Sequence, residues 1–159
     1  MADVIFEDYT IEVQNIMEDR ILAVLEECAG EVESAVKRNT TVGKVNGGKT
    51  KNQWKHKVVP SEYAAHIGND EETAIWLEFG TGEYALEGKG RKGGWYIPIG
   101  SGGISQSVVD AYGFKVVHGK DGKDFAHTYG MKPQRPFWNA YNSMKDKIIK
   151  RLQDSLKGL

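Results

Sequence analysis

Residues 13–35 of the chain read VQNIMEDRILAVLEECAGEVESA, and their apolar side chains recur every three or four positions. The recurring set is Val13, Met17, Ile21, Val24, Cys28, Val32 and Ala35. Such spacing is typical of an amphipathic helix with one apolar stripe. The only cysteine, Cys28, lies on this stripe, so we expect it to be a small buried hydrophobic residue. We predict a long N-terminal helix over residues 10–39.

The charges around this helix are segregated along the chain. Residues 1–33 carry ten acidic side chains and one basic side chain, Arg20, whereas residues 34–61 carry seven basic side chains and no acid. A solvated acidic helix face followed by a basic loop at residues 40–53 explains this pattern. Alternatively, the opposite charges help identical subunits to pack head to tail, or present positive charge to DNA or an acidic partner.

A second long helix is predicted at residues 136–157. Pro136 suits the first turn of a helix, where its missing N–H costs nothing. The apolar residues that follow at helical spacing are Phe137, Tyr141, Met144, Ile148, Leu152 and Leu156, and Gly158 marks the end. The exposed face of this helix is basic, so it suits pairing with the acidic first helix, within one subunit or between neighbours.

Residues 54–130 alternate short aromatic and β-branched runs with glycine-rich turns. These runs predict strands at residues 54–59, 63–67, 75–79, 95–99, 108–117 and 125–129, and a weaker strand at residues 4–8. Gly119 to Gly122 forms a good hairpin turn. We therefore predict an α+β fold: a long N-terminal helix, a central, mostly antiparallel sheet with glycine-rich loops, and a C-terminal helix packed on the sheet. Residues 1–159 form one domain, with a β-rich core at 54–130 that includes a variable loop at 100–122.

Composition favours a non-catalytic protein. The 159 residues suit one globular domain, and no apolar run approaches the length of a membrane-spanning helix. The acidic start lacks the basic region of a signal peptide, so we expect synthesis in the cytosol and no membrane partner. One cysteine cannot form an internal disulfide, and the four histidines lack zinc-site spacing. We predict no catalytic residue, no metal and no cofactor.

Residues 43–50, GKVNGGKT, match the letters of a phosphate-binding loop. The mechanism of such a loop requires a buried strand before it and a helix that starts at the Lys-Thr pair. Here the loop follows the long first helix and leads into a polar run. Nucleotide binding at residues 43–50 is therefore an alternative function, as is non-specific DNA binding.

Two segments carry a family resemblance: AIWLEFGTG at residues 74–82 and GMKPQRPFWNA at residues 130–140. The Glu-Phe-Gly-Thr-Gly and Arg-Pro-Phe motifs within them resemble the signatures of a phage minor tail and neck protein family, in which Arg-Pro-Phe opens the last helix. Members of this family are tail components or tail-completion proteins that assemble as rings where the head meets the tail. Residues 100–122 match no part of the family pattern and suit a loop that meets a particular partner.

The resemblance implies a structural protein of a tailed phage or prophage, located in the virion and in the host cytoplasm during assembly. The implied partners are further copies in a ring, other neck and tail proteins, and DNA contacted without sequence preference. The signature residues that serve assembly or folding are Glu78, Phe79, Gly80, Thr81, Gly82, Arg135, Pro136 and Phe137. We expect Glu78 to face a polar partner such as Arg135, and Gly80 and Gly82 to permit a tight turn. The lysines expected to face DNA or a partner are Lys44, Lys49, Lys51, Lys55 and Lys57.

Overall fold

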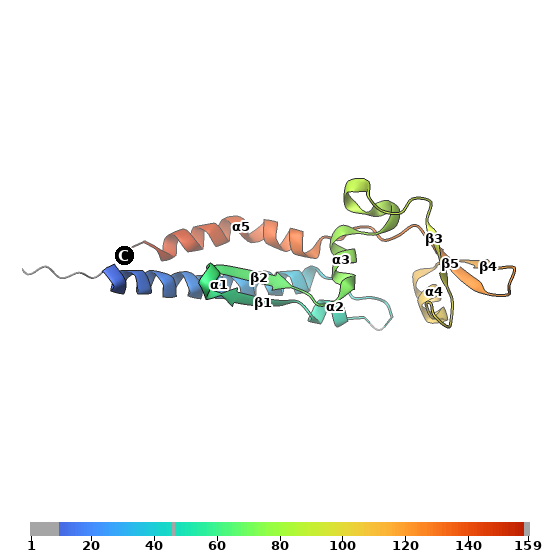
Figure 1. Cartoon of the computed structure of the whole chain (residues 1–159), viewed down its shortest axis with the longest axis horizontal. Helices are drawn as coiled ribbons and strands as arrows, with labels where there is room; N and C mark the ends of the chain where they lie inside the picture. Colours follow the sequence, from blue (N-terminus) through green and yellow to red (C-terminus); the bar gives the residue numbers. More distant parts are fainter. Residues whose placement is uncertain (1–9, 46, 158–159) are drawn as a thin grey trace, which may run out of the picture.

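The computed structural model of the protein describes residues 10–45 and 47–157. Within them, α1 (Thr10–Asn39) and α5 (Pro136–Ser155) confirm the two predicted long helices. The two helices lie side by side in an elongated molecule (Figure 1). The strand predicted at residues 4–8 and the helix end predicted at Gly158 lie outside the described residues.

The core lies where α1, α5 and the first strand meet. Val36 and Ala140 are fully buried, and Trp54 is 5% exposed. Phe137 packs against this cluster and stacks on Trp54 with ring centroids 6.4 Å apart. Cys28 is buried on the α1 stripe, as predicted. The apolar stripe of α1 therefore organises the fold, because α5 and a hairpin both pack on it.

The strands confirm the α+β class but form two small antiparallel sheets instead of one central sheet. The first sheet is a hairpin of β1 (Lys55–Val59) and β2 (Ala64–Gly68), joined by the 3-10 helix η1 (Pro60–Glu62). The second sheet has the order β3-β5-β4, with β3 at Trp95–Pro98, β4 at Lys115–His118 and β5 at Asp124–Thr128. The hairpin lies on α1, and α5 also packs mainly on α1.

The structure shows that two of the strand predictions are wrong. Residues 75–79 belong to α3 (Glu72–Phe79), and residues 108–117 are divided between α4 (Gln106–Tyr112) and β4. Gly113 separates α4 from β4 in the left-handed conformation, with φ 66°. Residues 100–122 are therefore a helix and a strand with short connections, not a long loop. The basic loop at 40–53 contains a one-turn helix, α2 (Lys49–Asn52).

The three-stranded sheet and α4 lie at one end of the molecule, and the N-terminal end of α1 lies at the other (Figure 1). Between α3 and β3 the chain makes two 3-10 turns, η2 (Gly82–Tyr84) and η3 (Leu86–Gly88). The predicted hairpin turn at Gly119 to Gly122 joins β4 to β5, with Gly119 N–H donating to the Lys123 carbonyl at 2.8 Å. The signature residues lie between the two ends, where α3 meets the start of α5.

Candidate functional site: the junction of α3 and α5

Glu78 caps the N-terminus of α5. Its two carboxylate oxygens accept hydrogen bonds from the backbone N–H groups of Phe137 at 2.9 Å and Trp138 at 3.0 Å. The first N–H groups of a helix have no partner inside the helix, and the positive end of the helix dipole favours a carboxylate. Glu78 is 9% exposed, so the cap is shielded from water. Glu78 thus faces polar partners, as expected, but these partners are backbone amides and not the side chain of Arg135.

The backbone joins the two signature segments beside this cap. The Leu77 carbonyl accepts hydrogen bonds from Gln134 N–H at 2.8 Å and Arg135 N–H at 3.1 Å. Thr81 and Met131 exchange two bonds: Thr81 N–H donates to the Met131 carbonyl, and Met131 N–H donates to Thr81 Oγ1, both at 2.9 Å. The segments thus form one rigid junction, although they lie about fifty residues apart in sequence.

Gly80 and Gly82 permit the turn that follows α3, as predicted. Both have positive φ angles, 72° and 60°, which residues with a Cβ rarely adopt. A Cβ on Gly80 would lie 2.8 Å from the Met131 carbonyl oxygen and from Pro133 Cδ. A Cβ on Gly82 would meet the Tyr129 carbonyl oxygen and the Trp95 ring. The turn therefore requires glycine for both its conformation and the close approach of residues 129–133.

Arg135 lies over an aromatic ring instead of pairing with a carboxylate. Its guanidinium carbon lies 4.4 Å from the centre of the Trp138 ring, a favourable cation–π geometry. The backbone of Arg135 is left-handed, with φ 56°, and Pro136 follows at the first helical position, fully buried. Arg135 Nε is buried without a hydrogen-bond partner among the described residues. Arg135 and Pro136 thus set the direction in which α5 leaves the junction.

One face of α3 is apolar and open to solvent. Ile75, Trp76 and Phe79 are 59%, 43% and 55% exposed, and helical spacing places them on the same side of α3. We call these three residues the α3 patch. Their helix neighbours Leu77 and Glu78 are buried on the opposite side. The signature therefore divides into Glu78, which holds the subunit together, and Phe79, which does not.

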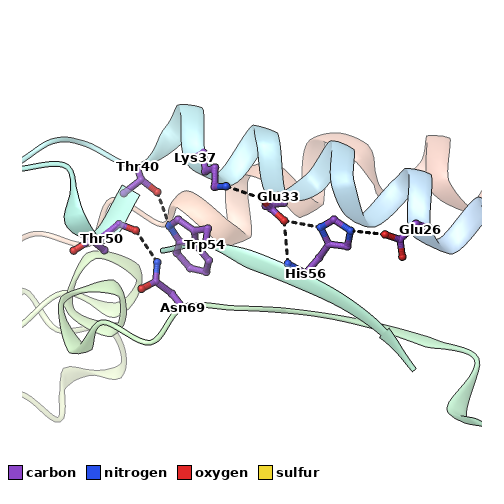
Figure 2. A network of polar contacts seen from close by, with 8 residues as sticks. All are labelled: Glu26, Glu33, Lys37, Thr40, Thr50, Trp54, His56 and Asn69. Atoms are coloured by element: carbon purple, nitrogen blue, oxygen red, sulfur yellow. Dashed lines mark hydrogen bonds and ion pairs between the residues drawn. The ribbon is translucent and has the colours of Figure 1, made fainter. Parts of the chain in front are cut away.

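A polar network ties the hairpin to α1 and was not predicted from the sequence (Figure 2). His56, on β1, lies between two glutamates of α1: its Nδ1 is 2.5 Å from Glu33 Oε2, and its Nε2 is 3.0 Å from Glu26 Oε1. Glu33 also accepts the backbone N–H of His56 at 3.0 Å and pairs with Lys37 at 2.6 Å. The seven-residue spacing of Glu26 and Glu33 places both carboxylates on one face of α1. This spacing is the sequence signal from which a site for a basic partner on that face could have been predicted.

The charges of this network shift two pKa values in opposite directions. The hydrogen bond that His56 makes to the Glu33 carboxylate, and then the one to Glu26, raise the pKa of His56 above its ordinary value. The hydrogen bond from Lys37 is the main cause that lowers the pKa of Glu33, although partial burial opposes it. The network therefore favours a protonated His56 beside an ionised Glu33.

The acidic and basic helices pair within one subunit. Glu31 of α1 accepts from Arg151 at 2.6 Å and from Lys147 at 3.1 Å, both on α5. Hydrogen bonds from Lys147 and Arg151 lower the pKa of the Glu31 carboxyl. Some of the acidic side chains of the first helix thus pair with basic side chains of the last helix within the same subunit.

The five lysines expected to face DNA or a partner lie in different surroundings. Lys44 Nζ donates to the Ala111 carbonyl at 2.9 Å and lies over the Tyr112 ring. Lys49 pairs with Glu71 at 2.9 Å, and Lys55 lies 4.0 Å from Asp70. Lys55 and Lys57 are exposed on β1 of the hairpin, and Lys51 is half-buried in α2. Contact of these lysines with DNA stays a prediction.

The phosphate-loop lookalike borders an open cleft of about 540 Å³ between α2, α3 and Tyr112. The segment before it is α1, not a strand, and the helix that begins at Lys49 has only four residues. The Lys49 ammonium is paired with Glu71. The strand–loop–helix arrangement of a phosphate-binding loop is therefore absent from the described part of this region.

The described residues hold neither a metal-binding cluster nor a membrane-spanning helix. No group of three or more His, Cys, Asp or Glu side chains there is arranged to hold a metal ion. Over the same ranges, 10–45 and 47–157, none of the helices is both long and apolar enough to cross a bilayer.

Comparison with known families gives one match. The family model described as "Bacteriophage HK97-gp10, putative tail-component" matches residues 7–80. No curated protein and no solved structure matches the chain. The Arg135-Pro136-Phe137 segment lies outside the matched range but is bonded to Leu77 and Glu78 inside it. The predicted resemblance is thus confirmed over residues 7–80, and the match supports a phage tail-component structural protein.

Proposed function

We propose that this chain is a non-catalytic, ring-forming subunit at the head-to-tail junction of a tailed phage or prophage. The phage tail-component match supports a structural protein that contacts other phage proteins in the virion. The ring and its place at the junction rest on the resemblance of the motifs at residues 78–82 and 135–137 to the signatures of the phage minor tail and neck protein family.

The α3 patch is the observation that carries the proposal. α3 buries the side that holds Leu77 and Glu78, and it leaves the large apolar side chains of the α3 patch exposed to solvent. Exposed aromatic side chains on a rigid support are typical of protein interaction sites. The capped junction supplies that support, because Glu78 and Leu77 fix α3 against α5. We therefore assign the α3 patch to contact with another protein of the particle.

The proposal is tested on particles made in a host that carries the phage genome. Mass spectrometry of purified virions should find the wild-type chain in a fixed ratio to the capsid protein. The double variant Trp76→Ser and Phe79→Ser should fold normally, as judged by circular dichroism, but should be lost from particles. Ile149→Ser is the matched control, because Ile149 is 53% exposed on α5 outside the patch.

The ring is tested separately by electron microscopy of the purified chain at low salt. Closed rings of uniform diameter are expected for the wild type. A chain absent from virions would contradict the structural function. A chain present in virions in a single copy would contradict the ring alone.

Nucleotide binding at residues 43–50 is the alternative function, and it predicts a different experimental result. Titration calorimetry with magnesium and ATP should detect no heat of binding, because Lys49 is engaged by Glu71 and the loop follows a helix. Micromolar binding by the wild type, lost in Lys49→Ala, would replace the structural proposal with a nucleotide-dependent one.

A further inference from the structure

The first helix extends beyond the helix that covers it. The Ser155 carbonyl, at the end of α5, accepts a hydrogen bond from Arg20 Nη1 at 3.4 Å, so residues 10–19 of α1 run on by about 15 Å. Val13 and Ile16 in this extension are 41% and 39% exposed. Val13, Arg20 and Glu31 lie on one side of α1, because the spacings between them are close to whole numbers of helical turns. Glu31 contacts Arg151 of α5, so the exposed residues of the extension lie on the side of α1 that α5 covers farther along.

Two acids flank these apolar residues. Glu12 and Asp19 are exposed and lie four residues before and three residues after Ile16, beside it on the helix surface. We call Glu12, Val13, Ile16 and Asp19 the tip patch. The tip patch is an apolar helix stripe with a negative border and no covering element among the described residues.

The three-stranded sheet at the other end has an open face of the opposite charge. Ala126 of β5 is fully buried, so its neighbour His127 points to the other face of the sheet. On that face, His127 pairs with Tyr96 of β3 and with Lys115 of β4. Tyr96 is 59% exposed, and Lys115, on the other side of His127, is also exposed.

The aromatic rings on this face form a continuous surface. The His127 ring centroid lies 4.8 Å from that of Tyr96 and 4.8 Å from that of Tyr129, which is 49% exposed. We call Tyr96, Lys115, His127 and Tyr129 the sheet patch. A sheet face of this kind is normally covered by a helix or by a second sheet.

The tip patch and the sheet patch cannot meet within one subunit. The thirty residues of α1 span about 45 Å, and the two patches lie at opposite ends of the molecule (Figure 1). Each patch is therefore available to a different molecule.

We infer that the tip patch of one copy packs on the sheet patch of the next copy. The helix stripe covers the open sheet face, and Val13 and Ile16 lie against Tyr96 and Tyr129. Glu12 and Asp19 then face Lys115, which makes the two surfaces electrostatically complementary. The contact joins different surfaces, so repetition gives a ring or an open filament. The inference rests on the proposed ring and names its subunit contact, leaving the α3 patch free for other phage proteins.

A mixing experiment tests the direction of this contact. Ile16→Glu damages the tip patch, and Tyr96→Glu damages the sheet patch, with each change in an exposed side chain. Each variant alone should be monomeric in sedimentation velocity, with association weakened at least about thirtyfold. An equal mixture should form heterodimers that do not grow, because one intact tip patch meets one intact sheet patch. Ile149→Glu is the control and should associate like the wild type.

Charge exchange supplies an independent test. Lys115→Glu should weaken association about tenfold, and so should Glu12→Lys combined with Asp19→Lys. The variant with all three changes should recover association, because the charges are again opposite. Lys57→Glu, on the hairpin, is the control. Added salt should weaken the wild-type contact and should have little effect on the Ile16→Glu monomer.

Several outcomes would overturn the inference. They are a mixture that stays monomeric, a charge-exchanged variant that does not recover, and a wild type that is monomeric at its highest soluble concentration. Rings that persist in both the Ile16→Glu and the Tyr96→Glu variants would also overturn it, but would keep the proposed function. Loss of the wild-type chain from virions would reject the proposed function, whatever the mixture shows.

Discussion

The indole N–H of Trp54 donates to Thr40 Oγ1 at 2.9 Å, and Thr40 in turn donates to the Val36 carbonyl at 2.7 Å. Both side chains are almost fully buried (Figure 2). The pair joins the end of α1 to the start of β1. The bond therefore fixes where the chain leaves the helix and enters the hairpin.

Replacing Thr40 with valine should destabilise the fold. Valine has nearly the same shape, but it leaves the Trp54 N–H buried without an acceptor, at a cost of about 1–3 kcal/mol. Urea unfolding measures this loss. Thr41→Val is the matched control, because the Thr41 hydroxyl bonds to Gln134 at an exposed position. Equal losses for the two variants would contradict the role of the buried bond.

Removing the carboxylate of Glu78 should loosen α5 from α3. Glu78→Ala leaves the Phe137 and Trp138 N–H groups uncapped and should lower the free energy of unfolding by about 2–4 kcal/mol. Glu78→Gln retains an acceptor oxygen and should lose less. Hydrogen exchange at the Phe137 and Trp138 amides reports the cap directly. Unchanged protection in Glu78→Ala would show that the bonds contribute little.

Gly80 should tolerate alanine less well than Gly88. Both have positive φ angles, 72° and 68°, but Gly80 also has ψ 176°, a combination that is essentially confined to glycine, so alanine carries a backbone strain of about 1–3 kcal/mol there. Only at Gly80 would the new Cβ meet backbone atoms, whereas the space beside Gly88 is open. The midpoint of thermal unfolding should therefore fall further for Gly80→Ala. A similar fall in the unfolding midpoint for both variants would contradict the additional cost at Gly80.

The His56 network should make stability depend on pH. The pKa of His56 is raised from 6.5, so its contribution is full below that value and is lost as pH rises through the folded pKa. The pKa of Glu33 is lowered from 4.5, so its contribution is full above that value and is lost as pH falls through the folded pKa. The network therefore stabilises the fold most between the two ordinary values.

Urea unfolding of the wild type and His56→Gln tests this dependence. The difference in stability between the two proteins should be larger at about pH 5.5 than at about pH 8.5. His66→Gln is the control, because His66 and its partner Glu62 are both exposed. A constant difference across the pH range would mean that His56 acts by packing alone.

The long helices and four of the strands were predictable because their patterns are long or unambiguous. The strand predicted at residues 75–79 was wrong because four of these five residues are apolar or aromatic, and such a short run fits a strand as well as a helix. The acids at Glu71 and Glu72 and the glycine at position 80 are helix signals that surround this run. Residues 108–117 were wrong because their valines suggested a strand, whereas Gly113 divides the segment.

The site was harder to predict than the fold because its bonds use the backbone. The motif letters suggested that Glu78 pairs with the opposite charge of Arg135. Pro136 at the first helical position has no N–H, so the next two amides, of Phe137 and Trp138, are the ones left for a carboxylate. The outward position of Phe79 follows from α3 being a helix, which the strand prediction concealed.

The pairing of α1 with α5 also decides when the protein can fold. About one hundred residues separate the end of α1 from the start of α5, so at ordinary synthesis rates the apolar stripe of α1 waits roughly 5–20 s for its partner. During that interval Val32 and Val36 lack the helix that buries them. A nascent chain therefore completes its core only after residues 136–155 leave the ribosome, and this order delays assembly of the subunit until α5 can pack on α1.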